Sequence, residues 1–412
     1  MPRPTPLHER TQPLCTSYAF KEWAGKIAVA AYDTHSEREY VALRHSVGLL
    51  DISPMYKYDL RGPDAAALAA RVCTRDITRL RAGRMAYTAM ADHRGACLDD
   101  LTVARLARDH VRLHTSEPWF HWLSEHQQGF DVEVTDTTDT VAALSLQGPL
   151  AARVLAPLVE LDLTTLRYFS LRQTTFAGGI PLTVSRTGFT GDLGFELFMA
   201  PEHAVAVWDA LMEEGQPHSI EPVGLNALDV ARIEAGFILQ GVDYLSARHV
   251  IAKAQLSTPH ELGLGWAVNL DRAPFVGQAA LKREAARGPG WATIGLQLDW
   301  AELERLYASE GIPPHLAPVA CRSSVPVYDT GGHNPIGQVT SSTWSPLLKR
   351  YLCIAQVQAP YAREGARLRF EHTPLYRRRQ ASALVQPLHP FEPARKAAPP
   401  ESPWRRSTTP SS

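Results

Sequence analysis

Three glycines recur at every third position in the segment Ser185–Glu196, and this segment constrains the fold more than any other. It reads Ser-Arg-Thr-Gly-Phe-Thr-Gly-Asp-Leu-Gly-Phe-Glu. Glycine lets the backbone approach another chain segment or a ligand closely, and it adopts positive φ at little cost. Residues 195–199 are typical of a strand, so the glycines open no helix as a dinucleotide-binding fingerprint would. The segment fits a tight hairpin turn and equally a turn beside a ligand, where Glu196 could reach a flat heterocycle.

Five further motifs accompany this segment in a fixed order along the chain. They are Asp51-Ile52-Ser53, Gly95-Ala96-Cys97-Leu98-Asp99-Asp100-Leu101, Leu146-Gln147-Gly148-Pro149, Gly224–Ala235 and Val339–Pro346. The succession resembles the T-protein of the glycine cleavage system, the aminomethyltransferase, and its folate-dependent relatives. The resemblance covers roughly residues 5–392. It implies a tetrahydrofolate-dependent one-carbon transferase.

Composition limits the classes of protein to consider. The chain has 412 residues, of which 45% are hydrophobic and 21% charged, which suits a globular protein of two or three domains. Its net charge of −1 gives no bulk attraction to nucleic acid or to a membrane surface. Five cysteines without C-x-x-C spacing suggest neither a disulfide framework nor a zinc site, and the histidines form no metal pattern.

The N-terminus and the lengths of the apolar runs indicate where in the cell the protein is located. No run of about 18 apolar residues occurs, so we expect no membrane span. Residues 1–6 lack the apolar core of a signal peptide and the long basic leader of a mitochondrial import segment. Together with the scattered cysteines, these features predict a cytoplasmic protein of bacterial type.

Strand-like and helix-like patterns alternate, which predicts an α+β fold. Beyond residue 290 short strands separated by turns predict a small all-β barrel or sandwich, and residues 300–324 look like an insertion in it. Residues 393–412 are rich in Pro, Ser, Ala and basic residues, so we expect a disordered tail.

The resemblance adds a domain plan that the pattern alone does not show. It implies a three-domain cloverleaf around a central folate pocket. The first domain would be discontinuous, at 1–56 and 142–275, the second would occupy 57–141, and a C-terminal β domain would occupy 276–392.

Two adjacent carboxylates, Asp99 and Asp100, lie within the strand pattern 98–106. The period of two places them on opposite faces. Aspartate is depleted in strands, so the pair indicates either a site or an edge strand with solvated charges. Spacing does not choose between the two residues. The resemblance assigns the catalytic role to Asp100, near N10 of the folate, where it would orient the cofactor and stabilise positive charge.

The carboxylate of Glu196 matches the family residue that holds the pterin. A pterin presents N3–H and a 2-amino group side by side, and one carboxylate can accept both. If Phe195 and Leu197 face the core, the period of two turns Glu196 toward a pocket or toward solvent.

Aromatic side chains could line the same pocket, since a flat pterin and an aminobenzoyl ring suit an aromatic wall. Tyr87 matches a family aromatic at the folate site, while Phe189 and Phe237 stand where aminomethyltransferases carry tyrosine. Single aromatics are more often core residues, and we expect this of Trp266, with a role in the pocket as the alternative.

Two further groups of charged residues receive structural interpretations. We expect Arg232 and Glu234, on the helix 225–235, to form structural ion pairs. The run 377–379 of three arginines is interpreted as a solvated turn, with attraction for a folate polyglutamate tail as the alternative.

Several positions depart from the family pattern. Histidine of the D-V-S-H-M motif is replaced by Pro54, the folate-contacting arginine of G-A-R-D by Leu228, and a tyrosine of the glycine segment by Phe189. The late tyrosine falls near Phe391-Glu392. Leucine replaces neither the charge nor the donors of arginine, so the folate tail must be held differently or the partner differs.

These features leave several functions to compare. The first is transfer of an aminomethyl group from the lipoyl arm of a carrier protein to tetrahydrofolate, with release of ammonia. The second is a demethylase or methyltransferase that uses a small-molecule one-carbon donor and forms 5-methyltetrahydrofolate. A non-catalytic folate-binding accessory protein is disfavoured because the region 239–243 lacks that group's cysteine. A folate domain serving an oxidase would need a separate subunit. Oligomeric state does not follow from the sequence.

Overall fold

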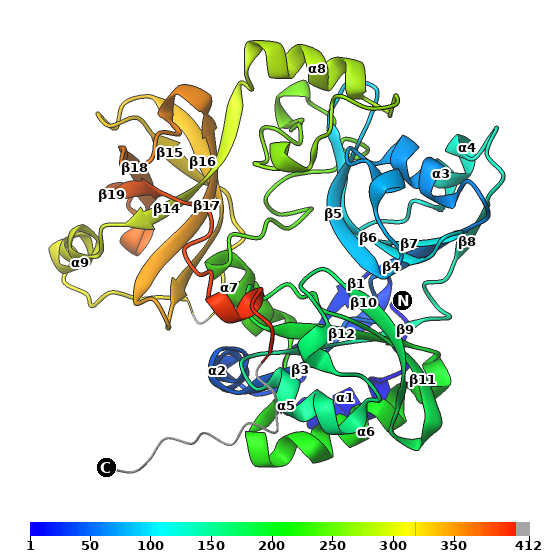
Figure 1. The fold of residues 1–412 in the computed structure, drawn as a ribbon. Helices are drawn as coiled ribbons and strands as arrows, with labels where there is room; N and C mark the ends of the chain where they lie inside the picture. Colours follow the sequence, from blue (N-terminus) through cyan, green and yellow to red (C-terminus); the bar gives the residue numbers. More distant parts are fainter. Residues whose placement is uncertain (318, 401–412) are drawn as a thin grey trace, which may run out of the picture.

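Helix α7 (Leu225–Glu234) lies where three β-sheets from different parts of the chain approach one another (Figure 1). A computed structural model describes residues 1–317 and 319–400. The helix packs against α2 (Glu37–His45), β2 (Lys26–Ala31) and two strands of the C-terminal sheet. Seven of its ten residues are buried, including the charged side chains of Arg232 and Glu234. The centre of the molecule is therefore polar as well as apolar.

The first sheet has six strands. One of them precedes the strands of the second sheet in the sequence, and the other five follow them. Its order is β10-β11-β12-β9-β3-β13, and only the β13–β3 pair is parallel among the pairs described. Helices α5 (Ala151–Leu155) and α6 (Ala204–Gly215) pack on it around buried Trp208 and Phe195. The strands are β10 (Leu171–Phe176), β11 (Ile180–Ser185), β12 (Gly194–Met199), β9 (Ala142–Gln147), β3 (Val47–Asp51) and β13 (Ile220–Pro222). The N-terminal elements are α1 (His8–Leu14) and the hairpin of β1 (Ala19–Trp23) with β2.

The second sheet has five antiparallel strands in the order β5-β6-β7-β4-β8. Helices α3 (Ala65–Val72) and α4 (Phe120–His126) cover one face with an apolar core. The other face meets the first sheet, where the rings of His114 and Phe198 stack at 4.9 Å. The strands are β5 (Arg84–Ala91), β6 (Cys97–Ala107), β7 (His110–Thr115), β4 (Tyr56–Arg61) and β8 (Glu133–Asp136).

The third sheet is a closed barrel of six strands in the order β14-β17-β16-β15-β18-β19. Closure removes the unpaired edges that an open sheet would expose. Helix α8 (Gln278–Arg287) leads into the barrel, and α9 (Trp300–Ser309) follows its first strand. The strands are β14 (Trp291–Leu298), β17 (Arg350–Gln358), β16 (Pro335–Ser345), β15 (Val325–Tyr328), β18 (Arg367–His372) and β19 (Arg379–Gln386).

The α+β class with a C-terminal β-barrel is confirmed, and the differences are local. The segment predicted to be an insertion, 300–324, begins with α9, a helix capped by Asp299, whose carboxylate accepts from Glu302 N at 3.1 Å. The expectation of disorder across 393–412 is wrong for residues 393–400. There Arg395 forms a two-pronged ion pair with buried Asp192, with N–O distances of 2.6 and 2.7 Å. Residues 401–412 lie outside the described residues.

Candidate functional site

The carboxylate of Asp100 is held between two tyrosine hydroxyls on the inner face of the second sheet. Tyr87 donates to Oδ2 at 2.6 Å and Tyr244 donates to Oδ1 at 2.5 Å. Strand register brings Tyr87 alongside, because Ala89 pairs with Asp100 and Tyr87 with Thr102. Burial raises the pKa of Asp100, and the two phenol hydrogen bonds partly offset the effect. Both acceptor atoms of this carboxylate are therefore fixed by neutral donors.

The neighbouring carboxylate, Asp99, points into the opposite, fully buried face. Its Oδ2 accepts from Trp119 Nε1 at 2.7 Å and from Ser116 N at 3.0 Å, while Oδ1 has no partner among the described residues. Burial, followed by the charge of Asp100, raises the pKa of Asp99 to about 8. The predicted two-faced arrangement is confirmed, and the alternative of a solvated edge pair is wrong.

The raised pKa of Asp99 predicts that stability falls as pH rises. Between the unfolded value of 3.8 and the folded value of about 8, the folded chain keeps a proton that the unfolded chain releases. The Asp99→Asn variant has no such proton. Its free energy of unfolding, relative to the natural chain, should rise by on the order of 3 kcal/mol between pH 5 and pH 8. Urea denaturation at several pH values measures this difference, and a difference independent of pH would contradict the assignment.

Tyr244 was missed by the sequence analysis, because it lies in a loop without periodicity. Its neighbour Asp243 fixes that loop. The Oδ1 atom of Asp243 accepts from Thr340 at 2.5 Å and from Ser341 at 2.6 Å, and its Oδ2 atom accepts from Arg232. The barrel motif 339–346 is thus connected to α7 and to the loop that positions Tyr244.

The glycine segment forms a tight turn, which agrees with the hairpin interpretation of its sequence. A Cβ on Gly188 or on Gly194 would overlap the side-chain amide of Gln147, which lies between them. Gly191 has φ of +75°, and its Cα packs against Ala235 at the end of α7. The turn is therefore built around a buried glutamine and seated on the central helix.

Glu196 leaves this turn on β12 with its side chain partly buried. Its backbone neighbours Phe195 and Leu197 are fully buried on the other face, as the period of two predicts. The Oε2 atom accepts from the Thr187 hydroxyl at 2.5 Å. Burial raises the pKa of Glu196, while the hydroxyls of Thr187 and Ser185 oppose the shift. The carboxylate thus has hydroxyl partners on its own hairpin.

Two aromatic pairs stand beside these carboxylates. Phe189 of the glycine turn stacks on Phe237, which lies three residues beyond the end of α7, with ring centroids 5.6 Å apart. Tyr87 stacks on Trp266 at 5.9 Å. The expectation that Trp266 is a core residue is wrong, since it is 62% exposed. An exposed indole on the partner of Asp100 can pack against a ligand as well as against protein.

The contacts of the predicted site residues divide these residues into two groups. Asp100 and Tyr87 make one group on the second sheet, and Glu196 lies with Phe189 and Phe237 around the glycine turn. One apolar cluster joins Tyr87 and Tyr244 to Ile238, the residue after Phe237. The end of α7 therefore connects the two groups.

Arg232 and Glu234 are structural, as expected. Glu234 accepts from Tyr40 at 2.6 Å, from Arg44 Nε at 2.8 Å and from Ser345 at 2.5 Å, all within the protein interior. Arg232 donates to Asp229 at 2.7 Å besides its bond to Asp243. These buried ion pairs join the first sheet, α7 and the barrel.

The positions at which the chain differs from the family pattern have local structural consequences. Leu228 packs in an apolar cluster with Leu347, so it offers no donor. Two cations from outside α7 contact this part of the helix: Arg322 donates to Asp229 at 2.6 Å, and Lys21 donates to Asn226 at 2.7 Å. Pro54 is buried beside Ser53. The arginine missing at position 228 is therefore not replaced on α7 itself.

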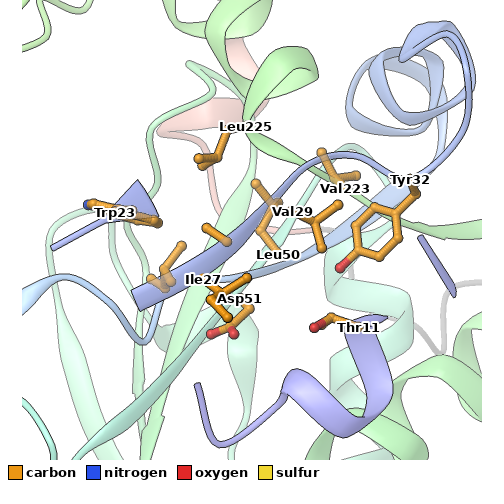
Figure 2. A pocket seen from close by; sticks show the side chains of 11 residues that line it. Thr11, Trp23, Ile27, Val29, Tyr32, Leu50, Asp51, Val223 and Leu225 are labelled. Carbon is orange, nitrogen blue, oxygen red and sulfur yellow. The ribbon is translucent and has the colours of Figure 1, made fainter. Parts of the chain in front are cut away.

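One enclosed pocket lies away from these residues, between α1, β2 and β3 (Figure 2). Figure 2 shows Thr11, Tyr32 and Asp51 among its lining, with apolar side chains around them. Its volume of about 10 Å³ holds at most one water molecule. It is too small for a pterin. Within residues 1–317 and 319–400, no three His, Cys, Asp or Glu side chains gather as a metal site would require, and no helix has the length and apolarity to cross a bilayer.

Comparison with known proteins identifies the family. The GCVT N-terminal domain matches residues 15–272, and the glycine cleavage T-protein C-terminal barrel domain matches residues 312–389. The chain belongs to the glycine cleavage T-protein family. Among the T-proteins, aminomethyltransferase of Geobacillus kaustophilus is 36% identical over 334 residues, covering 80% of this chain and 84% of its own.

Further T-proteins extend the match to nearly the whole chain. Aminomethyltransferase of Bacillus cytotoxicus is 32% identical over 360 residues, covering 86% of this chain and 89% of its own. The crystal structure of glycine cleavage system aminomethyltransferase T from Bartonella henselae aligns with a TM-score of 0.79 at 26% identity. That alignment covers 95% of this chain and 99% of the other. The shared fold thus includes all three sheets described above.

Proposed function

We propose that this protein is a tetrahydrofolate-dependent aminomethyltransferase, which accepts an aminomethyl group from a lipoyl carrier protein and releases ammonia. The observation that carries the proposal is the Asp100 carboxylate, fixed by Tyr87 and Tyr244 on the inner face of the second sheet. Neutral donors add no positive charge, so a carboxylate that they hold can stabilise a developing cation when it is ionised. The membership of the chain in the T-protein family supports the same reaction.

The residues present fit a reduced folate. Glu196 is a partly buried carboxylate whose described partner is a hydroxyl, so an N–H pair from a pterin would relieve its desolvation. The stacked pair Phe189 and Phe237 offers an aromatic wall to a flat ring. Bound tetrahydrofolate would supply the nucleophilic nitrogen that accepts the one-carbon unit.

Each side chain then has a defined task. Glu196 would bind the amino-pyrimidine edge of the pterin and set its orientation. Asp100 would orient the bridging nitrogen and stabilise positive charge, while Tyr87 and Tyr244 hold its carboxylate in place. Trp266, stacked on Tyr87, would exclude water from that side.

The proposal also includes the domain boundaries and the cellular location. The three sheets support domains at 1–56 with 142–275, at 57–141 and at 276–392. The five cysteines are all free, which supports a reducing, cytoplasmic location.

Product analysis tests the reaction. The purified protein is incubated with tetrahydrofolate and an aminomethylated lipoyl carrier protein, and in parallel with small methyl donors. We expect ammonia and 5,10-methylenetetrahydrofolate from the carrier reaction. Formation of 5-methyltetrahydrofolate from a small donor, without ammonia, would replace this proposal with the demethylase. Binding of tetrahydrofolate without turnover of any donor would favour the accessory protein.

The proposed role of Glu196 predicts a specific loss of folate affinity. In Glu196→Gln the amide can accept one hydrogen bond but presents its own N–H₂ to the second pterin donor. Loss of a charged hydrogen bond corresponds to a roughly 10- to 100-fold weaker Kd for tetrahydrofolate. Calorimetry with tetrahydrofolate measures it. Glu202→Gln is the matched control, since Glu202 is an exposed carboxylate just beyond the same strand. Equal affinities for both variants would contradict the assignment.

A further inference from the structure

A cleft lined by arginines opens between the start of β5 and the start of β10. Its volume is about 540 Å³, and no acidic residue is among the side chains that line it. The whole chain has a net charge of −1, so the positive charge of the cleft is a local feature of this surface. The lining consists of Arg79, Arg81, Arg84, Arg167 and Arg172, with Leu80, Thr165 and Ser170.

Some of these guanidinium groups are already fixed in position. Arg84 Nη1 donates to Ser170 Oγ at 2.6 Å, and Arg172 Nη1 donates to Leu171 O at 2.8 Å. Arg79 pairs with Asp76 at 3.2 Å, outside the lining. Burial and then the charges of Arg167 and Arg172 lower the pKa of Arg84, which agrees with cations held near one another. An anionic ligand would relieve that repulsion.

A residue next to the cleft in the sequence shares a cation contact with the aromatic wall of the proposed folate site. Arg167 lines the cleft, and the ring of the next residue, Tyr168, lies 5.8 Å from Lys396 Nζ. The same ammonium lies 5.4 Å from the ring centroid of Phe237. Lys396 is kept there by the ordered C-terminal segment, which Arg395 ties to Asp192. Lys396, which also pairs with Glu392 at 3.2 Å, thus lies against Phe237 and against the residue that follows Arg167 of the cleft.

We propose that this cleft binds the carboxylates of a poly-γ-glutamate tail on the folate, an inference that rests on the proposed function. A flexible chain with one carboxylate per residue matches several guanidinium groups, each of which can donate two hydrogen bonds to one carboxylate. The alternative raised from the sequence, the run 377–379, is disfavoured as a tail site. There Arg377 and Arg379 already pair with Glu310, at 3.2 and 2.9 Å.

Binding measurements with matched folates test the proposal. The probes are tetrahydrofolate with one and with five γ-linked glutamates, and free penta-γ-glutamate. We expect the natural chain to bind the five-glutamate form about tenfold more tightly than the one-glutamate form, the gain that several exposed ion pairs together can give. In Arg81→Gln/Arg167→Gln, this ratio should fall to about two, with the one-glutamate Kd unchanged. Both arginines are exposed, so their replacement leaves the core intact.

The control variant is Arg377→Gln/Arg378→Gln, which removes the same charge from exposed positions on the barrel. It should keep the tenfold ratio. A ratio near one in the natural chain, or one unchanged in Arg81→Gln/Arg167→Gln, would overturn the proposal. So would a raised KM for the carrier protein with an unchanged ratio, because the cleft would then bind an acidic protein surface. If no folate binds, the proposed function fails, whereas binding of free penta-γ-glutamate that depends on Arg81 and Arg167 would still locate the anion site.

Discussion

Replacement of Asp100 by asparagine should lower kcat by at least about 100-fold while leaving the chain folded. Asparagine has the shape of aspartate but no charge, and its amide nitrogen cannot accept the hydrogen bond that Tyr87 or Tyr244 donates. The variant therefore loses both the negative charge and the fixed orientation of the side chain. Steady-state kinetics with tetrahydrofolate and a one-carbon donor measures the loss, and thermal unfolding verifies the fold.

Asp99→Asn is the matched control for this experiment, because it makes the same substitution one residue away on the opposite face of β6. Asp99 contacts Trp119 in the core of the second sheet and faces away from Tyr87. We expect its kcat to stay within about threefold of the natural value, as for a residue without contact to the reacting atoms. Near-normal turnover in Asp100→Asn would reject the proposed role, as would equal losses in the two variants.

The second large effect concerns stability. Glu234→Ala should lower the free energy of unfolding by about 3–5 kcal/mol. The change removes the acceptor of Tyr40, Arg44 and Ser345, and it leaves the fully buried guanidinium of Arg44 with Asp192 at 3.9 Å as its remaining described carboxylate. An uncompensated buried charge is costly because it has lost its hydration. Urea denaturation measures the change.

An exposed ion pair provides the comparison. Arg38 of α2 pairs with Glu221 of β13 at 2.8 Å, and its side chain is 74% exposed. Glu221→Ala should therefore cost less than about 1 kcal/mol. If Glu234→Ala is no more destabilising than Glu221→Ala, then the central ion pair does not hold the first sheet, α7 and the barrel together.

Local periodicity predicted the directions of the carboxylates. Alternation along β6 separated Asp99 from Asp100, and alternation along β12 turned Glu196 away from the buried Phe195 and Leu197. Short strands separated by turns predicted a small all-β barrel or sandwich, and the structure shows a closed barrel. Such inferences succeed because they depend on one strand and one period.

Contacts between distant segments could not be predicted in the same way. Tyr244 reaches Asp100 from 144 positions away, and its loop is fixed by barrel hydroxyls rather than by any local pattern. The order of residues 393–400 depends on the ion pair of Arg395 with Asp192, which composition alone cannot show. The exposure of Trp266 likewise reflects how β5 meets a loop far along the chain. Tyr244 and Trp266 complete the proposed site, and neither contact could be predicted from local sequence.

A crystal structure of the protein with bound tetrahydrofolate tests the central claim most directly. The account predicts the amino-pyrimidine edge within hydrogen-bonding distance of Glu196, the bridging nitrogen facing the Asp100 carboxylate, and ring contacts with Phe189 or Phe237. A folate bound elsewhere, or bound there without its bridging nitrogen near the Asp100 carboxylate, would contradict the account.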